Sequence, residues 1–132
     1  MPLTSLGQIA LSVSDADRAQ AFYADTLGLP LLYRYGDLVF FDLAGVRLML
    51  SAAPEPGEDA RIPPAEIQAS PGVCHYFKVE NLEQVYAELQ GKGVVFSDAP
   101  HLIARMPDHE LWMAFFTDPD GHALAMMEEK PL

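Results

Sequence analysis

The chain has 132 residues, of which 50% are hydrophobic and 20% charged, a balance typical of one globular domain and unlike that of a disordered chain. No apolar run approaches the roughly 18 residues that a bilayer-crossing helix needs, so we expect no membrane partner. The formal net charge of −11, with eight Lys and Arg residues scattered singly, argues against a nucleic-acid partner. It favours a cationic ligand over an anionic one, although acidic charge also serves solubility alone. The single cysteine, Cys74, cannot form an internal disulfide and the first residues lack a secretion signal, so we expect a cytoplasmic location.

The first half of the chain predicts a strand, a helix and three further strands. Residues 8–13 alternate in the manner of a half-buried strand. A helix is expected over residues 15–27, because Ser14 or Asp15 can cap its first turn and Gly28 suits the left-handed turn after its end. Three strand-like runs follow, at residues 31–35, 37–43 and 46–51.

The second half repeats this order. Residues 74–79 predict a strand, and residues 82–90 predict a helix with Asn81 and Gln84 as a capping box. Three further strands are expected, at residues 94–97, 111–117 and 122–127. The sequence DPDG at residues 118–121 predicts a tight turn, since Pro fixes the first turn angle and Gly supplies a positive φ.

The order βαβββ therefore occurs twice, which predicts an α+β fold built from two tandem modules. Module one is assigned to residues 5–53 and module two to residues 73–130. Residues 54–72 between them are rich in Pro, Gly and charge without a hydrophobic period, and are interpreted as a connector. Neither module can bury both faces of its own sheet, so residues 1–132 are expected to fold as a single domain.

Several short sequences in this repeat are those of a known superfamily. They are VSD at residues 13–15, AFY at 21–23, LGL at 27–29 and FTDPDG at 116–121. Together with the doubled βαβββ order, they make the chain similar to the vicinal oxygen chelate superfamily, which includes glyoxalase I, extradiol dioxygenases, and fosfomycin and bleomycin resistance proteins. The resemblance spans nearly the whole chain and implies a curved mixed sheet that bears a ligand-binding cleft.

In the metal-dependent members of that superfamily, His, Glu or Gln ligands occupy four equivalent positions on the first and last strands of the modules. Spacing along the strands places Gln8, Met49, Cys74 and Ala125 at these positions. An amide, a thioether, a thiol and a methyl group offer a hard divalent ion almost nothing. The carboxylate that would act as the base in glyoxalase-type isomerisation is missing as well. We therefore expect no cofactor, with a divalent metal as the alternative.

His75 is the residue on which that alternative depends. It lies one residue later in its strand than Gln8 does in the equivalent strand of module one, and such a shift turns the side chain to the opposite face. We expect Cys74 to face the cleft and His75 to face the helix, unless a bulge at residues 72–73 reverses them. If a metal is bound, Gln8 and His75 are its expected ligands.

Aromatic and polar residues of the predicted strands are the remaining candidates. Trp112, the only tryptophan, is placed to stack on a flat or cationic ligand, or else packs in the core. His109 and Glu110 are candidates for acid–base catalysis, or else are solvated loop residues. His101 and His122 are expected at the surface or in turns. The ligand-binding candidates are Gln8, Tyr33, Tyr35, Met49, Cys74, Tyr76, Trp112 and Ala125, with Phe40 as a further aromatic residue.

Three kinds of function are compatible with these features. The emptied ligand positions and aromatic strands favour metal-independent binding or sequestration of a small aromatic or cationic molecule, as in bleomycin resistance proteins. The alternative is a glyoxalase-like lyase or isomerase, with a degenerate or partner-completed metal site or with acid–base chemistry by His109 and Glu110. The third is an interaction module. A homodimer is expected, because similar proteins often complete their clefts across a two-fold axis and isologous dimers are the commonest oligomers.

Overall fold

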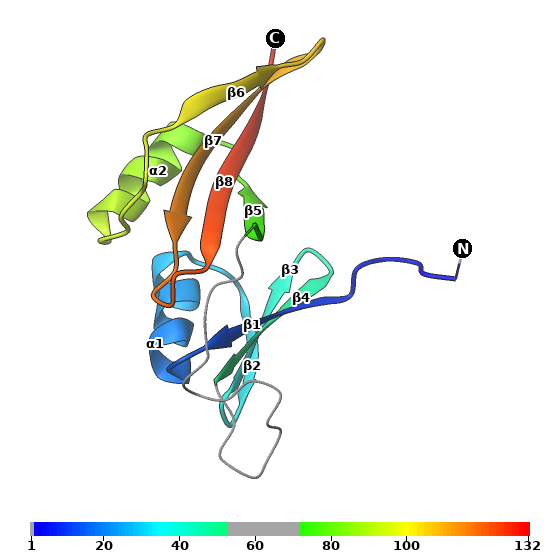
Figure 1. The fold of residues 1–132 in the computed structure, drawn as a ribbon, viewed down its shortest axis with the longest axis vertical. Coiled ribbons are helices and arrows are strands. Elements are labelled where there is room, and N and C mark those ends of the chain that lie inside the picture. Colours follow the sequence, from blue (N-terminus) through cyan, green and yellow to red (C-terminus); the bar gives the residue numbers. More distant parts are fainter. Residues whose placement is uncertain (1, 53–71) are drawn as a thin grey trace. The chain divides into compact units, whose positions relative to one another are not determined.

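The computed structural model describes residues 2–52 and 72–132, which belong to two compact units, Met1–Gln68 (unit 1) and Ala69–Leu132 (unit 2). Each unit contains a four-stranded mixed sheet and a helical segment (Figure 1). The predicted α+β class with two βαβββ modules is confirmed. Apart from Gly72, the predicted connector lies outside the described residues.

Unit 1 follows the predicted order closely. Its strands are β1 (Gln8–Val13), β2 (Leu31–Tyr35), β3 (Leu38–Leu43) and β4 (Val46–Ala52), in the sheet order β1-β4-β3-β2. Strand β1 runs parallel to β4, and the other pairs are antiparallel. The predicted helix is formed by α1 (Ala16–Gln20), which continues directly as the π-helical segment η1 (Ala21–Thr26). Asp15 caps it as expected, because its carboxylate accepts a hydrogen bond from the Arg18 backbone nitrogen at 3.1 Å.

The core of unit 1 lies between this helix and one face of the sheet. Alternate residues of a strand share a face, so the buried strand residues form one apolar surface. On the helix side they are Leu11, Val13, Val39, Phe41, Leu48 and Leu50, and one further buried strand residue, Phe40, lies on the opposite face. Tyr23 of η1 is fully buried against them, with its ring centroid 6.1 Å from that of Phe41. Within residues 2–52, no helix lies over the opposite face of the sheet.

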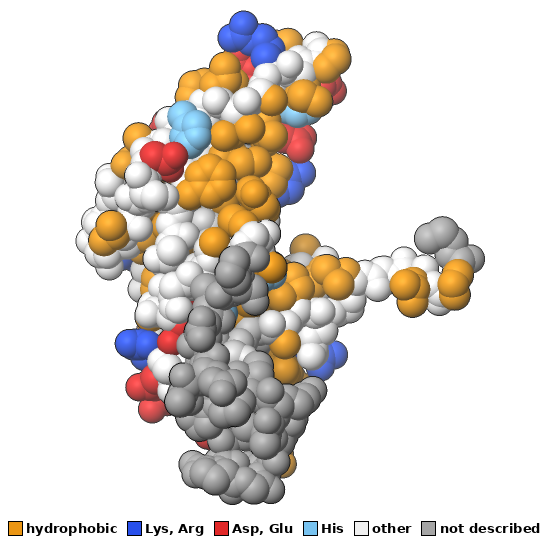
Figure 2. Space-filling view, viewed as in Figure 1, with side chains coloured by type: hydrophobic (Ala, Val, Ile, Leu, Met, Phe, Trp, Pro, Cys, Tyr) orange, Lys and Arg blue, Asp and Glu red, His pale blue; other side chains and the backbone are white. Residues whose placement is uncertain are grey.

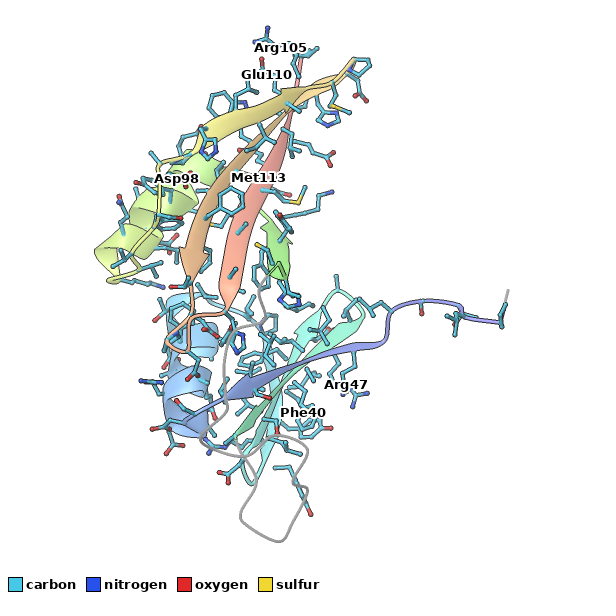
Figure 3. The ribbon with its side chains drawn as sticks, in the orientation of Figure 1. Phe40, Arg47, Asp98, Arg105, Glu110 and Met113 are labelled. Carbon is cyan, nitrogen blue, oxygen red and sulfur yellow. The ribbon has the colours of Figure 1, made fainter. Side chains whose placement is uncertain are left out.

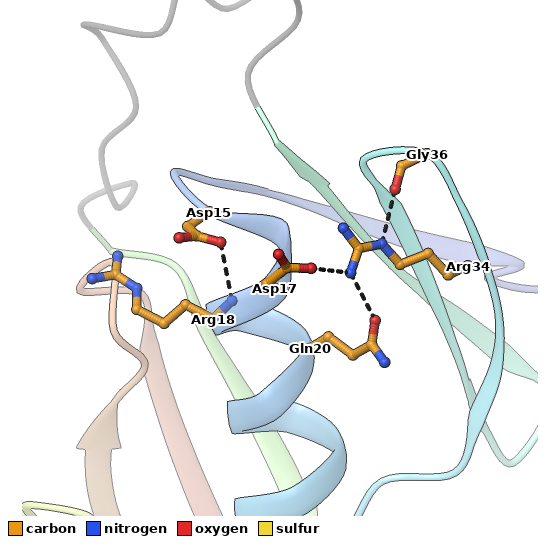
Figure 4. Close-up of polar contacts among 6 residues, drawn as sticks. All are labelled: Asp15, Asp17, Arg18, Gln20, Arg34 and Gly36. Atoms are coloured by element: carbon orange, nitrogen blue, oxygen red, sulfur yellow. Dashed lines mark hydrogen bonds and ion pairs between the residues drawn. The ribbon is translucent and has the colours of Figure 1, made fainter.

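Arg34 ties the β2–β3 hairpin to α1 (Figure 4). Its Nη1 donates to Asp17 Oδ1 at 2.6 Å and to Gln20 Oε1 at 3.0 Å, and its Nε donates to the Gly36 carbonyl at 2.8 Å. Gly36 has a φ of 59°, so this bond holds a turn in the left-handed region. The guanidinium therefore fixes the helix and the hairpin relative to each other within unit 1.

We predict that Arg34→Met lowers the free energy of unfolding by about 0.5–1 kcal/mol, a modest loss because solvent screens the ion pair. The Asp17 side chain is 86% exposed. Urea denaturation measures the change. The control is Arg18→Met, which removes the same charge but has its guanidinium on Ser14 one turn away. Equal losses in the two variants would show that net charge, and not the contact between hairpin and helix, is responsible.

Unit 2 has strands β5 (Cys74–Lys78), β6 (His101–Arg105), β7 (His109–Thr117) and β8 (Ala123–Pro131), with helix α2 (Leu82–Gly91). The sheet order is β5-β8-β7-β6, with β5 parallel to β8. The strand predicted at residues 94–97 is wrong, since only the bridge from Phe96 to Phe116 forms there. Phe96 instead packs between Tyr86 and Phe116, at centroid distances of 4.7 and 5.1 Å. The Phe96 side chain therefore serves core packing, and the second strand of the unit, β6, begins at His101.

The start of α2 also differs from the prediction. The Asn81 side chain donates to Gln84 Oε1 at 2.8 Å and caps no backbone group. Instead, Glu128 of β8 accepts a hydrogen bond from the Leu82 backbone nitrogen at 2.9 Å. A carboxylate at a helix N-terminus is favourable because the first amides have no partners within the helix. The predicted capping box is therefore replaced by a tertiary cap.

The predicted turn between β7 and β8 is confirmed. Asp118 is buried, and its Oδ1 accepts hydrogen bonds from the backbone nitrogens of Asp120 at 3.0 Å and His122 at 2.8 Å. Gly121 has a φ of 86°. His122 follows the turn as expected but is buried, whereas His101 lies on β6 with its side chain 42% exposed, in agreement with the expected surface position. Among the helices within residues 2–52 and 72–132, none is long and apolar enough to cross a membrane.

Candidate functional site

Strand pairing assigns each strand side chain to one of two faces. Helix α1 contacts β3 and β4 in unit 1, and α2 contacts β7 and β8 in unit 2. We call the sheet face away from the helix of the same unit the open face. In unit 1 it carries Gln8, Tyr33, Tyr35, Phe40, Arg47 and Met49. In unit 2 it carries Cys74, Tyr76, His101, Met113, Phe115, Ala125 and Met127.

The open face of unit 1 is organised around Phe40, which pairs with Met49 on one side and Tyr33 on the other. The rings of Tyr33 and Phe40 are stacked, with centroids 4.6 Å apart and an interplanar angle of 25°. The Arg47 guanidinium carbon lies 5.9 Å from the Phe40 centroid (Figure 3). The Gln8 amide nitrogen donates to Met49 Sδ at 3.9 Å. Two predicted ligand residues, Tyr33 and Met49, therefore flank Phe40, and a third, Gln8, is hydrogen-bonded to Met49.

The open face of unit 2 is organised around Ala125. Tyr76 of β5 and Phe115 of β7 are its two cross-strand partners, and their rings meet edge to face with centroids 6.3 Å apart. Ala125 itself is fully buried. Figure 2 shows hydrophobic side chains gathered over β7 and β8, with histidine and acidic side chains at the margin. An aromatic pair therefore flanks the position where metal-dependent relatives are expected to hold a carboxylate.

Trp112 lies on the other face of the same sheet, with Glu128 as its cross-strand partner. The Lys130 ammonium sits 4.5 Å from its ring centroid, so the chain's own cation already makes the cation–π contact. Its indole nitrogen donates to Glu110 Oε1 at 3.1 Å. The structure thus separates Trp112 from the other predicted ligand residues.

The carboxylate oxygens of Glu110 are likewise already bonded to side chains of this protein (Figure 3). Besides the bond from Trp112, its Oε2 accepts from Arg105 Nε at 3.0 Å, and these two contacts hold the pKa of the Glu110 carboxyl below its ordinary value. His109 is the preceding residue of β7, and successive strand side chains point to opposite faces. Its Nδ1 lies 2.7 Å from Asp108 Oδ1. The structure does not bring His109 and Glu110 together on one face, so it offers no support for joint acid–base catalysis.

The expected orientation of His75 is confirmed. It pairs with the fully buried Leu124 on the helix side, whereas Cys74 pairs with Ala123 on the open face. The pairing of β5 with β8 runs without a register shift from Cys74 onward, so no bulge within the strand turns His75 over. Burial, followed by the nearby His122, lowers the pKa of His75. Burial also raises the pKa of the Cys74 thiol, partly offset by a hydrogen bond with Tyr76.

The lowered pKa of His75 predicts an acid-sensitive fold. As the pH falls through the ordinary histidine range near about 6.5, the unfolded chain takes up a proton that the folded chain resists, so stability is lost with falling pH. We expect His75→Gln to lessen the loss of melting temperature between pH 7 and pH 5. Thermal denaturation at several pH values measures it. The same acid dependence in the variant and the original protein would assign the effect to other groups.

The residues predicted to occupy the four metal-ligand positions of the superfamily do not fit a divalent metal. Gln8 and Met49 are joined to each other, Cys74 is a thiol with a raised pKa, and Ala125 has no donor. Hard divalent ions prefer several oxygen or nitrogen donors. Across the part of the chain that the structure describes, no three or more His, Cys, Asp and Glu side chains are grouped in a way that could hold a metal ion.

Comparison with known proteins gives the class of protein to which this fold belongs. Residues 5–126 match the model of the Glyoxalase/Bleomycin resistance protein/Dioxygenase superfamily, and the chain belongs to this superfamily. It is 31% identical over 126 residues to the uncharacterized protein YraH of Bacillus subtilis, covering 89% of this chain and 92% of YraH. It is 27% identical over 123 residues to the metallothiol transferase FosB of Lysinibacillus sphaericus, covering 92% and 80% of the two chains.

Solved structures show the same fold at lower identity. An integron cassette protein from the mobile metagenome of V. cholerae has a TM-score of 0.74 and 17% identity, with 97% of each chain covered. A lactoylglutathione lyase from Agrobacterium tumefaciens has a TM-score of 0.70 and 22% identity, with 96% of this chain and 95% of that chain covered. At these identities the similarity establishes the fold alone.

Proposed function

We propose that this protein binds a small aromatic molecule, neutral or cationic, on its open sheet faces without the help of a metal ion. The observation that carries the proposal is the aromatic pair beside the metal positions of the superfamily. Tyr76 and Phe115 flank Ala125, and Tyr33 stacks on Phe40 next to Met49. Each pair presents ring surface where a metal-dependent relative needs donors.

Burial of apolar ring surface can supply the free energy of binding. Tyr33 and Tyr76 are each about half exposed, so a flat ligand can cover ring surface that water now contacts. Burial of apolar surface contributes about 25 cal/mol per Å², and an aromatic pair adds roughly 0.5–1.5 kcal/mol beyond area. The Arg47 guanidinium over Phe40 disfavours a cation at that position of unit 1, whereas the overall charge of −11 favours one elsewhere.

Calorimetry and thermal-shift measurements with a panel of neutral and cationic aromatic compounds test this proposal. We expect saturable stabilisation by part of the panel. Tyr76→Ala removes one ring of the unit 2 pair and should weaken binding, whereas Tyr86→Ala removes a ring from α2 and should not. Flat responses across the whole panel would contradict the proposal.

An enzymatic activity is the second candidate, favoured by the similarity to the metallothiol transferase FosB. In this reading the metal site is degenerate or completed by a partner subunit, and Gln8 with His75 would supply protein ligands. The opposite orientations of Cys74 and His75 weigh against it. Metal analysis of protein purified without a tag separates the two functions. Stoichiometric Ni, Zn, Mn or Fe would replace the binding proposal by a metalloenzyme.

We also propose that the protein is a cytoplasmic homodimer. Strand β2 is the edge of the unit 1 sheet, and all five of its residues are exposed, including Leu31, Leu32, Tyr33 and Tyr35. An apolar sheet edge of this kind is commonly covered by a partner. Light scattering at low concentration should give twice the chain mass of 14.5 kDa, and a value near 14.5 kDa would contradict the dimer.

A further inference from the structure

His101 is a polar group at the margin of the aromatic surface of unit 2. It is the first residue of β6 and the cross-strand partner of Met113. Its ring centroid lies 6.2 Å from that of Phe115, with the two planes inclined by 37°. The side chain is 42% exposed, so solvent or a ligand can reach it. Phe115 is thus in contact range of both His101 and Tyr76.

The orientation of the imidazole is set by the residues just before it. His101 Nδ1 lies 2.9 Å from the Ala99 carbonyl oxygen and 3.4 Å from Asp98 Oδ2. A carbonyl oxygen can only accept, so Nδ1 carries the hydrogen. In the neutral imidazole Nε2 then holds a lone pair and acts as a hydrogen-bond acceptor. The tautomer is therefore decided by the protein before any ligand arrives.

Asp98 is itself anchored to the sheet (Figure 3). Its Oδ1 accepts from the Phe115 backbone nitrogen at 3.4 Å. The neighbouring Ser97 donates from both its backbone nitrogen and its Oγ to the Phe115 carbonyl, at 2.9 and 3.0 Å. These contacts hold residues 97–101 against the edge of β7 at the position of Phe115. The acceptor and the aromatic ring are thus parts of one local arrangement.

Apart from the Asp98 carboxylate, which already accepts from the Phe115 backbone nitrogen and lies against His101 Nδ1, the side chains beside the Phe115 ring are poor acceptors. Phe115 and Ala125 have no side-chain acceptor, and the sulfur of Met113 is a weak one. The Tyr76 hydroxyl interacts with Cys74. On these grounds, and resting on the proposed function, we infer that His101 is the acceptor that orients the ligand. The ligand class is accordingly a planar aromatic molecule with an O–H or N–H donor at its edge, such as a phenol or an N–H heteroaromatic compound.

Two matched probes test this inference. 2-Naphthol and 2-methoxynaphthalene share a ring system, but only the first has an O–H donor. We expect the protein to bind 2-naphthol about three- to tenfold more tightly, the range that one hydrogen bond supplies. His101→Phe should abolish this preference while keeping the affinity for the ether. Gln90→Ala, on α2, serves as the control and should keep the preference.

The outcomes distinguish the inference from the proposed function. Binding of neither probe by the original protein would overturn both. Binding of both probes with a preference that His101→Phe leaves intact would overturn the role of His101 alone. Should that variant fail to fold, the ring-nitrogen resonance of His101 in the original protein provides the measurement. It should shift with 2-naphthol and not with 2-methoxynaphthalene, and equal shifts would overturn the inference.

Discussion

Replacing Ala125 by glutamate is expected to lower the free energy of unfolding by about 3–5 kcal/mol at pH 7, the cost of an unpaired buried charge. Ala125 is fully buried, and its cross-strand neighbours Tyr76 and Phe115 offer rings and not cations. Metal-dependent relatives are expected to carry a carboxylate at this position. In this chain the same substitution should cost stability and create no metal site, because the surrounding residues supply no further hard donors.

Ala125→Gln is the matched control, since it adds nearly the same volume without a charge and should cost about 1–3 kcal/mol. Burial raises the pKa of the introduced carboxyl, so the folded form of Ala125→Glu takes up a proton more readily than the unfolded chain. Its stability should therefore recover toward that of Ala125→Gln as the pH falls from 7 to 5. Urea denaturation at both pH values measures this. Two results would contradict the view that position 125 is buried and lacks metal donors around it. They are equal stability of the two variants at pH 7 and stoichiometric binding of added Ni²⁺ or Zn²⁺ by Ala125→Glu.

Phe41→Ala is expected to lower the free energy of unfolding by about 3–5 kcal/mol, since it opens a cavity in the core of unit 1. Phe41 is fully buried and lies next to Tyr23, on the helix side of the sheet. Such a loss is a large part of the total stability of an ordinary domain, roughly 5–15 kcal/mol. Tyr35→Ala on the open face, where the residue is 74% exposed, should cost less than about 0.5 kcal/mol.

The same variant tests whether the chain folds as a single domain. Phe41 belongs to unit 1, whereas Trp112, the only tryptophan, belongs to unit 2 and reports on that unit by its fluorescence. If the two units unfold together, Phe41→Ala should shift the transition seen at Trp112 as much as the transition seen by circular dichroism. An unchanged transition at Trp112 would show that the units fold independently.

The order of elements was accessible from the sequence because it depends on local patterns. The alternation of residues 8–13, the cap at Asp15 and the DPDG turn each use neighbours along the chain, and each is confirmed. The second strand of unit 2 was misplaced for the opposite reason. Residues 94–97 have strand-like composition, but the Phe96 ring packs against Tyr86 and Phe116 in the core. Local propensity does not reveal what a side chain will pack against.

Some features of the candidate site likewise follow from local sequence, and others depend on tertiary structure. The lack of metal donors at Gln8, Met49, Cys74 and Ala125, and the opposed orientations of Cys74 and His75, follow from residue identity and a two-residue period. The sequence by itself determined these features. Only the tertiary structure decided that Trp112 lies on the helix side beneath Lys130, and that His101 joins Phe115 on the open face. Pairing between strands distant in the chain assigns those faces, and that pairing is settled by packing, which no single segment encodes.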